Sequence, residues 1–237
     1  MKIVLIGYGK MGREIETAAL ARNHSVIAKI DIDNYDELNA TLASEADVAI
    51  EFTTPSSVLK NIYKCFELNL PIVVGTTGWH NELDKIKRAC NEGNHSLFYS
   101  SNFSVGVNLF FALNENLAEM MNNFKQYDVS MKEIHHTQKL DAPSGTAVTL
   151  ADMIVARLER KSHWNLGEGK INEINIEAIR EGDVKGTHSV KYESEIDTIE
   201  VTHSAKSRKG FAEGAVLAAE YLWNKKGIFT MRDLLGI

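Results

Sequence analysis

The sequence predicts an α/β protein in which an N-terminal domain with a parallel sheet is joined to a smaller α+β domain with a mixed or antiparallel sheet. Two observations carry this prediction. Through residues 1–103, short apolar runs alternate with segments of helical pattern, which is typical of a parallel sheet covered by helices. Between residues 174 and 204, strand-like segments follow one another without intervening helices, which indicates a sheet of another kind.

A glycine-rich turn follows the first predicted strand, residues 2–6, and opens a helical pattern. The motif G-x-G-x-x-G indicates a dinucleotide site when it lies between a strand and a helix, as it does here. The first glycine permits the turn, the second lets the backbone approach a pyrophosphate, and the third allows the helix to pack closely on the strand. The next strand, residues 25–30, ends at an acidic residue that suits the ribose hydroxyls. We therefore predict a Rossmann-like nucleotide site formed by Gly7, Tyr8, Gly9, Lys10, Met11, Gly12 and Asp31.

Three further predicted strands, residues 46–52, 70–74 and 96–100, each end in a short polar or glycine-containing segment. Residues 32–45 are too few for a helix and a strand, so this crossover is predicted to be a loop or a short helix. Ligands of parallel sheets bind beyond the carboxyl ends of the strands. The segments at these ends extend the predicted nucleotide site to Phe52, Gly75, Thr76, Thr77, Ser100, Ser101, Asn102 and Phe103.

The pattern changes after Phe103, where a long helical stretch precedes the strands of the second sheet. An alanine-rich helix at residues 211–223 is expected to return to the first domain and cover its sheet. We therefore place a dinucleotide-binding domain at residues 1–103 with 209–237, and a substrate-binding and oligomerisation domain at residues 104–208. Four polar side chains on or beside the later strands are predicted to face solvent: Arg180, His188, His203 and Arg208. Arg208 is alternatively expected to help hold the two domains together.

The residues from Glu133 to Ala147 concentrate the chemistry of the second domain. The alternating pattern before His135 predicts a strand, so His135 and His136 are expected to point to opposite faces. Lys139 lies in the loop that follows, and the next helix is expected to begin at Gly145 behind a serine cap. A helix start presents unpaired N–H groups and a partial positive charge. The stretch therefore predicts a cationic pocket with a proton source for an anionic substrate.

We predict no metal site, because two adjacent strand histidines cannot chelate one ion and no cysteine or third histidine lies nearby in the sequence. The 26 basic and 32 acidic residues give a net charge of −6, which argues against a general binder of nucleic acid or of membrane surfaces. The two cysteines have no metal-binding spacing, and neither a signal peptide nor a membrane span is evident. A cytoplasmic location is therefore expected.

The stretch Glu133-Ile-His-His-x-x-Lys-x-Asp-Ala-Pro-Ser-Gly-Thr-Ala147 closely resembles the signature of the 4-hydroxy-tetrahydrodipicolinate (dihydrodipicolinate) reductases of lysine and diaminopimelate synthesis. Segments along the whole chain match the order of motifs in this family. The resemblance implies a homotetramer that uses NADH or NADPH to reduce a cyclic imine dicarboxylate to tetrahydrodipicolinate. It also implies that His135 and Lys139 handle the proton, and that His136, Gly145 and Thr146 bind the substrate carboxylates.

The chain departs from some members of this family in being compact after Asp31 and in carrying Ile32 where an arginine can meet the 2′-phosphate of NADPH. Asp31 would repel that phosphate, whereas Lys10 would attract it, so NADH or dual use is expected. Two alternatives remain open at this point. One is a dinucleotide-sensing protein without turnover, which has no need of a proton donor, and the other is a dehydrogenase for another small imino or amino acid.

Overall fold

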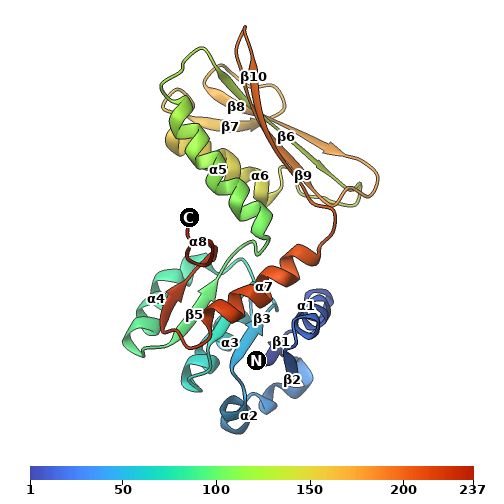
Figure 1. The fold of residues 1–237 in the computed structure, drawn as a ribbon, viewed down its shortest axis with the longest axis vertical. Helices are drawn as coiled ribbons and strands as arrows, with labels where there is room; N and C mark the ends of the chain where they lie inside the picture. The colour runs from blue at the N-terminus through green and yellow to red at the C-terminus, as the bar shows by residue number, and fades with distance from the viewer. The chain divides into compact units, whose positions relative to one another are not determined.

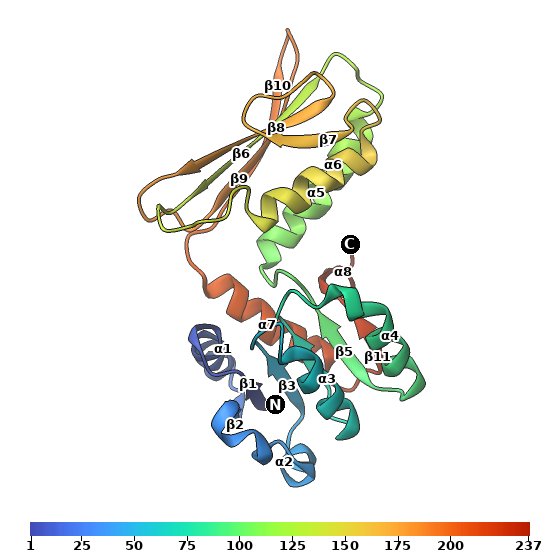
Figure 2. The ribbon, with the colours of Figure 1, turned by 180° about the vertical axis from the view of Figure 1, so that it is seen from behind.

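The computed structural model describes residues 1–237, which form two compact units (Figures 1 and 2). Unit 1 comprises Met1–Val105 and Lys209–Ile237, and unit 2 comprises Gly106–Arg208. None of the helices combines the length and the apolar character that crossing a membrane requires. The α/β fold class predicted from the sequence is confirmed, with a parallel sheet in unit 1 and a mixed sheet in unit 2.

The sheet of unit 1 has six parallel strands in the order β11-β5-β4-β3-β1-β2. Its strands are β1 (Lys2–Ile6), β2 (Ser25–Ile30), β3 (Val48–Glu51), β4 (Ile72–Val74), β5 (Ser96–Tyr99) and β11 (Gly227–Phe229). Its main helices are α1 (Lys10–Ala21), α3 (Val58–Glu67), α4 (Leu83–Glu92) and α7 (Lys209–Leu222). Shorter helices are η1 (Ile32–Glu37), α2 (Ala40–Glu45), η2 (His80–Glu82) and α8 (Met231–Leu235).

Two apolar cores lie on the two faces of this sheet, as the uninterrupted apolar strands require. One core contains side chains of α1 and α7, and the other contains side chains of α3 and α4. Close packing of α7 depends on Gly214, since a Cβ there would lie 1.7 Å from the carbonyl oxygen of Phe103. The predicted return of the alanine-rich helix to this sheet is therefore confirmed.

The sequence patterns missed several short elements. Strands β7 (His163–Leu166) and β11 and helix α8 were not predicted, because runs this short carry little periodicity. The crossover at residues 32–45 holds the two short helices η1 and α2, where a loop or one short helix was expected.

The sheet of unit 2 has five strands in the order β10-β9-β6-β8-β7. The remaining strands are β6 (Asp128–His135), β8 (Glu173–Arg180), β9 (Thr187–Glu193) and β10 (Thr198–Ser204). β6 runs parallel to β8 and antiparallel to β9. Helices α5 (Val105–Met121) and α6 (Gly145–Arg157) pack against one face of the sheet and close its core (Figure 1).

Strand alternation in β6 decides which side chains meet under these helices. Val129 and Met131 are buried in the core, and residues two apart on a strand share a face, so Glu133 and His135 point the same way. In the strand register, Glu133 lies opposite His188 of β9 and His135 lies opposite Arg180 of β8. The same face of the sheet therefore brings a carboxylate, two imidazoles and a guanidinium together.

Candidate active site

The glycine loop of unit 1 is shaped by close approaches that only glycine allows. Gly7 has φ +91°, and a Cβ there would lie 2.1 Å from the carbonyl oxygen of Phe52. A Cβ on Gly12 would lie 2.4 Å from the carbonyl oxygen of Gly7. Gly9 is different, because a Cβ there would meet no atom within 4 Å. Since α1 begins at Lys10, its unpaired N–H groups start beside this open space.

A cavity of about 640 Å³ opens beside the loop in unit 1. Its walls include Gly7, Tyr8, Gly9, Asp31 and Phe52, which the sequence assigned to the nucleotide site. The open approach at Gly9, the helix start and this volume together fit a dinucleotide whose pyrophosphate lies over the loop.

Asp31 lies at the end of β2, at the mouth of this cavity. Its carboxylate accepts hydrogen bonds from the backbone N–H groups of Ile32 at 2.9 Å and of Tyr8 at 3.4 Å. The neighbouring Ile32 side chain is 88% exposed. The carboxylate is therefore fixed where the cofactor ribose is expected, with an exposed apolar side chain next to it.

The remaining side chains of the loop differ in their surroundings. The Tyr8 hydroxyl donates to Glu16, and the ammonium of Lys29 lies 4.5 Å from the centre of the Tyr8 ring. Lys10 is exposed and Met11 is half-buried. Tyr8 is thus held from two sides, whereas Lys10 is open to solvent.

The loops after β3 and β4 pack tightly together. A Cβ on Gly75 would lie 2.1 Å from the Phe52 ring, and the Thr76 hydroxyl oxygen accepts a hydrogen bond from the Thr53 N–H at 2.7 Å. Thr77 is exposed. The side chain of Phe52 therefore joins this loop to the wall of the cavity.

The segment after β5 has a defined turn. The Ser100 hydroxyl donates to the carbonyl oxygen of Asn102 at 2.7 Å, and Ser101 is exposed. Phe103 is buried, with its ring centre 5.7 Å from that of Phe52. Of the predicted nucleotide residues, Gly7, Tyr8, Gly9, Asp31 and Phe52 line the cavity. The start of α1 at Lys10, Met11 and Gly12 and the segments after β4 and β5 do not.

A buried carboxylate below these loops was missed by the sequence interpretation. Glu51, at the end of β3, is fully buried and accepts hydrogen bonds from the Thr53 hydroxyl and from Asn61. Burial raises the pKa of Glu51, and these hydrogen bonds oppose the rise only in part. An acidic residue ending an otherwise apolar strand was the signal that this group would need partners.

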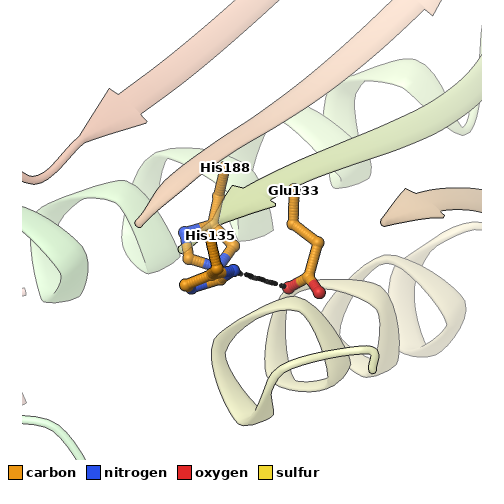
Figure 3. A group of neighbouring side chains, drawn as sticks. All are labelled: Glu133, His135 and His188. Carbon is orange, nitrogen blue, oxygen red and sulfur yellow. Dashed lines mark ion pairs between the residues drawn. The ribbon is translucent and has the colours of Figure 1, made fainter. Parts of the chain in front are cut away.

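In unit 2, Glu133 is the centre of a second buried cluster (Figure 3). Its carboxylate accepts hydrogen bonds from the Ser144 N–H at 3.0 and 3.2 Å and from Nη2 of Arg180 at 2.9 Å. Burial acts to raise the pKa of Glu133, but the neighbouring His188 and the hydrogen bonds from Ser144 and Arg180 outweigh it and hold the pKa far below its ordinary value. The carboxylate is therefore ionised at neutral pH.

The two imidazoles of the cluster both lie near this carboxylate. Nδ1 of His135 is 3.6 Å and Nε2 of His188 is 3.7 Å from Oε2 of Glu133. The ring centres of the histidines are 5.0 Å apart, and His188 also shares a 3.0 Å hydrogen bond with the Ser144 hydroxyl. Burial lowers the pKa of His135 from 6.5 to about 4, so this imidazole is neutral at neutral pH.

Two sequence-based expectations are wrong at this point. His188 and Arg180 were predicted to face solvent, yet His188 is buried and Arg180 binds the buried carboxylate of Glu133. No third histidine was expected near His135 and His136, because none lies close in the sequence. In the fold, β9 places His188 beside His135. Both errors have the same cause, because strand register is not visible in local patterns.

Lys139 lies in the loop between β6 and α6. Its ammonium forms a 2.8 Å ion pair with Asp141, and its side chain is 22% exposed. Arg180 donates to the carbonyl oxygens of Lys139 at 3.3 Å and of Asp141 at 2.6 Å. The guanidinium therefore holds both the loop and Glu133, which fixes the path of the chain around Lys139.

The start of α6 has the predicted cap. The Ser144 hydroxyl accepts the N–H of Ala147 at 3.2 Å, as an N-cap residue does. The N–H groups of Gly145 and Thr146 have no partner within the helix, and a Cβ on Gly145 would meet nothing within 4 Å. The helix start is thus open to an anion.

His136 lies beyond the end of β6 and does not join the buried cluster. Its Nε2 is 3.4 Å from a guanidinium nitrogen of Arg208, a residue predicted to face solvent or to link the domains. The two histidines differ in burial, with His135 buried and His136 half-buried, although the strand expected to carry both ends at His135.

Unit 1 has a glycine loop beside a cavity that suits a dinucleotide, and unit 2 has a buried imidazole, a lysine in the following loop and an open helix start. These features fit an oxidoreductase that depends on a nicotinamide nucleotide. Residues 1–103 match the family described as "Dihydrodipicolinate reductase, N-terminus", and residues 106–235 match "Dihydrodipicolinate reductase, C-terminus". The chain belongs to the dihydrodipicolinate reductase family and is an NAD(P)H-dependent reductase of lysine and diaminopimelate biosynthesis.

Individual relatives agree with this assignment. A 4-hydroxy-tetrahydrodipicolinate reductase of Christiangramia forsetii is 51% identical over 100% of this chain and 98% of the relative. The enzyme of that name from Methanocaldococcus jannaschii is 36% identical, over 98% of this chain and 81% of the relative.

Among solved structures, a dipicolinate-bound dihydrodipicolinate reductase from Paenisporosarcina has a TM-score of 0.78 at 23% identity, with 97% of both chains covered. An engineered D-amino acid dehydrogenase bound to NADP+ reaches 0.54 at 12% identity, over 98% of this chain and 93% of the other. These two likenesses concern the fold. The family matches and the sequence relatives decide the function, and they decide against the sensor and the other dehydrogenase.

Proposed function

We propose that this chain converts 4-hydroxy-tetrahydrodipicolinate to tetrahydrodipicolinate, with the nucleotide held by unit 1 and the dicarboxylate held by unit 2. The observation that carries this assignment is the run from His135 to Thr146, which combines a buried imidazole, an ammonium and an open helix start. An anionic substrate that must receive a proton needs these three features.

The names of substrate and product define what the residues must do. The product has a hydrogen where the substrate has the 4-hydroxyl group, so the reaction overall adds one hydride and one proton and releases one water. When bound, NADH or NADPH supplies the hydride. The protein must therefore provide the proton and hold the ring with its carboxylates fixed.

Lys139 and His135 are assigned to the proton. At neutral pH the lowered pKa of His135 leaves its imidazole uncharged, so the donated proton is assigned to Lys139, whose ammonium pairs with Asp141. The neutral imidazole is then able to hydrogen-bond the substrate and to exchange a proton with Lys139. The two residues act as a pair, and a positioned acid or base of this kind contributes roughly 100- to 10,000-fold to the rate.

The substrate carboxylates are assigned to the start of α6 and to His136. The N–H groups of Gly145 and Thr146 point along the helix axis, where its partial positive charge adds to their donor strength. His136 lies beside the guanidinium of Arg208, so this end of the site is also cationic. One carboxylate is bound by backbone donors and the other by side chains in this scheme.

The nucleotide is assigned to Gly7, Tyr8, Gly9, Lys10, Met11 and Gly12, to Asp31, and to the loops that hold Phe52, Gly75, Thr76, Thr77, Ser100, Ser101, Asn102 and Phe103. We propose a preference for NADH, because the Asp31 carboxylate disfavours a 2′-phosphate. Lys29, which also lies on β2, is ion-paired with Glu16 at 2.7 Å and adds little net positive charge.

We also propose a homotetramer in the cytoplasm. The face of the unit 2 sheet opposite α5 and α6 is uncovered and carries a 2.9 Å ion pair between Lys132 and Glu177, which suits sheet-to-sheet contact with another copy. A cytoplasmic location accords with the free thiols of Cys65 and Cys90 and with the need for reduced nucleotide.

The test is a coupled assay in which the preceding synthase generates the substrate from pyruvate and aspartate semialdehyde, and nicotinamide absorbance is followed. We expect substrate-dependent oxidation with both nucleotides and a higher kcat/KM for NADH. Tight nucleotide binding without oxidation would reject the assigned substrate. A higher kcat/KM for NADPH would reject only the NADH preference inferred from Asp31 and would leave the assigned reaction intact.

A further inference from the structure

We propose that Glu133 is a positioning residue that couples the His135 imidazole to the anion-binding start of α6. The inference rests on the proposed role of His135 and adds a residue that neither touches the substrate nor exchanges its proton. Its basis is the set of contacts that one buried carboxylate makes with the two arms of the site. Figure 3 shows Glu133 beside the histidines.

The first arm is the helix start. Both oxygens of Glu133 accept the N–H of Ser144, which is the cap residue of α6. The hydroxyl of Ser144 caps the helix and is hydrogen-bonded to His188. The carboxylate therefore fixes the position of the residue that precedes the substrate-binding N–H groups of Gly145 and Thr146.

The second arm is the imidazole of His135. Its Nδ1 is buried without a hydrogen-bond partner, and Oε2 of Glu133 lies 3.6 Å from it. This separation is slightly longer than a hydrogen bond, and catalytic hydrogen bonds commonly tighten when the substrate binds. An ionised carboxylate can only accept hydrogen bonds. The His135 tautomer that can donate to Glu133 is therefore the one with hydrogen on Nδ1.

The opposite nitrogen of the ring is kept accessible by a glycine. Gly186 has φ +141°, and a Cβ there would lie 3.1 Å from Nε2 of His135. With hydrogen on Nδ1 directed at Glu133, Nε2 is the nitrogen that remains for a proton or for the substrate. Glu133 thus selects both the tautomer and the direction in which the ring acts.

The charges around His135 make the Glu133 carboxylate the main group that can stabilise a protonated imidazole. Burial lowers the pKa of His135, and the neighbouring His188, Lys139 and Arg180 lower it further, whereas Glu133 acts in the opposite direction. These groups come from β6, β8, β9 and the loop before α6, and Glu133 is the anion among them. A proton that reaches the ring during turnover is therefore stabilised mainly by Glu133.

The cluster also has the donor types of a metal site, since ligand atoms of Glu133, His135 and His188 lie within 4.8 Å of one another. Arg180 and the Ser144 amide already occupy the carboxylate, and a guanidinium 2.9 Å from it opposes a cation. We therefore interpret Glu133 as a residue that positions His135 and Ser144, which agrees with all of its contacts.

The decisive experiment is Glu133→Gln, alone and combined with His135→Ala. The glutamine oxygen still accepts the Ser144 N–H, so the helix arm is retained while the negative charge is lost. We expect kcat to fall between about 10- and 100-fold, the range seen for loss of a group that orients an active residue. In the His135→Ala background the same change should have little further effect, because Glu133 acts through the imidazole.

Glu67→Gln is the matched control, since Glu67 is exposed on α3, pairs with Lys64 and has no assigned role in the site or in subunit contact. It should leave kcat unchanged, and Glu133→Gln should leave NADH affinity unchanged because the nucleotide is assigned to unit 1. Nitrogen-15 NMR of the wild-type ring should show hydrogen on Nδ1. This measurement needs no variant and so decides the case even where Glu133→Gln folds poorly.

The outcomes distinguish the proposed role of His135 from the positioning role of Glu133. Native turnover in His135→Ala would overturn the proposed role of His135. Loss of turnover in His135→Ala together with native turnover in Glu133→Gln would overturn the positioning role alone. Additive losses in the double variant, or a wild-type ring with hydrogen on Nε2, would overturn it as well.

Discussion

Removing the buried imidazole of His135 should make the protein less sensitive to mild acid. Folding buries this side chain to 7% exposure and lowers its pKa from 6.5 to about 4. Between these two pH values the unfolded chain binds a proton that the folded chain does not bind. The free energy of unfolding therefore falls as the pH decreases through this window, and His135→Gln removes that dependence.

The magnitude follows from the two pKa values. At pH 5 the unfolded histidine is almost fully protonated and the folded one is almost fully neutral, whereas near pH 7 both are mostly neutral. Linkage then gives a loss of about 2 kcal/mol between pH 7 and pH 5 for this residue alone. This is a large part of the stability of an ordinary domain.

The assay is urea unfolding at the two pH values, followed by circular dichroism, for wild type, His135→Gln and the control His80→Gln. His80 lies in η2 and is exposed, so it serves as a surface histidine for comparison. We expect wild type and His80→Gln to lose about 2 kcal/mol more than His135→Gln. Equal losses in all three would show that His135 is not held neutral by burial.

Three further predictions concern single positions. Lys139→Ala should retain NADH affinity but lower kcat roughly 100-fold or more, measured in the coupled assay; near-native turnover would exclude it as the proton source. Gly9→Val should weaken NADH binding at least about tenfold by calorimetry while changing the melting temperature little, because a Cβ at this position would meet no atom within 4 Å; unchanged affinity would contradict the placement of the pyrophosphate. Gly214→Ala should lower the free energy of unfolding by about 1–3 kcal/mol, because its Cβ overlaps the Phe103 carbonyl; native stability would contradict the packing of α7.

Local patterns were sufficient wherever one segment carries its own signal. The apolar run of β1 and the glycines after it predicted both the strand and the start of α1. Ser144 before Gly145 predicted the cap, and the hydrogen bond to Ala147 confirms it. These features depend on residues within a few positions of one another, so no knowledge of the fold is needed to find them.

The buried cluster of unit 2 could not be found in this way. Glu133, His188 and Arg180 come from three strands, and their meeting depends on the register of β6 with β9 and β8. One signal was nevertheless present, since Glu133 alternates with Val129 and Met131 and therefore faces the core. A carboxylate on an apolar face requires partners from elsewhere in the fold, which is a reason to search the other strands for cations.

The proposed roles of the two units differ in how they depend on pH. In unit 1 the pyrophosphate is assigned to backbone N–H groups and to the open space at Gly9, and neither of these features titrates. In unit 2 the proton is assigned to a pair that includes His135, whose pKa is held low by burial. It follows that acid should weaken turnover through unit 2 while NADH affinity stays constant. Titrating NADH affinity and kcat over the same pH range would separate the two contributions, and a parallel fall in both would contradict this division.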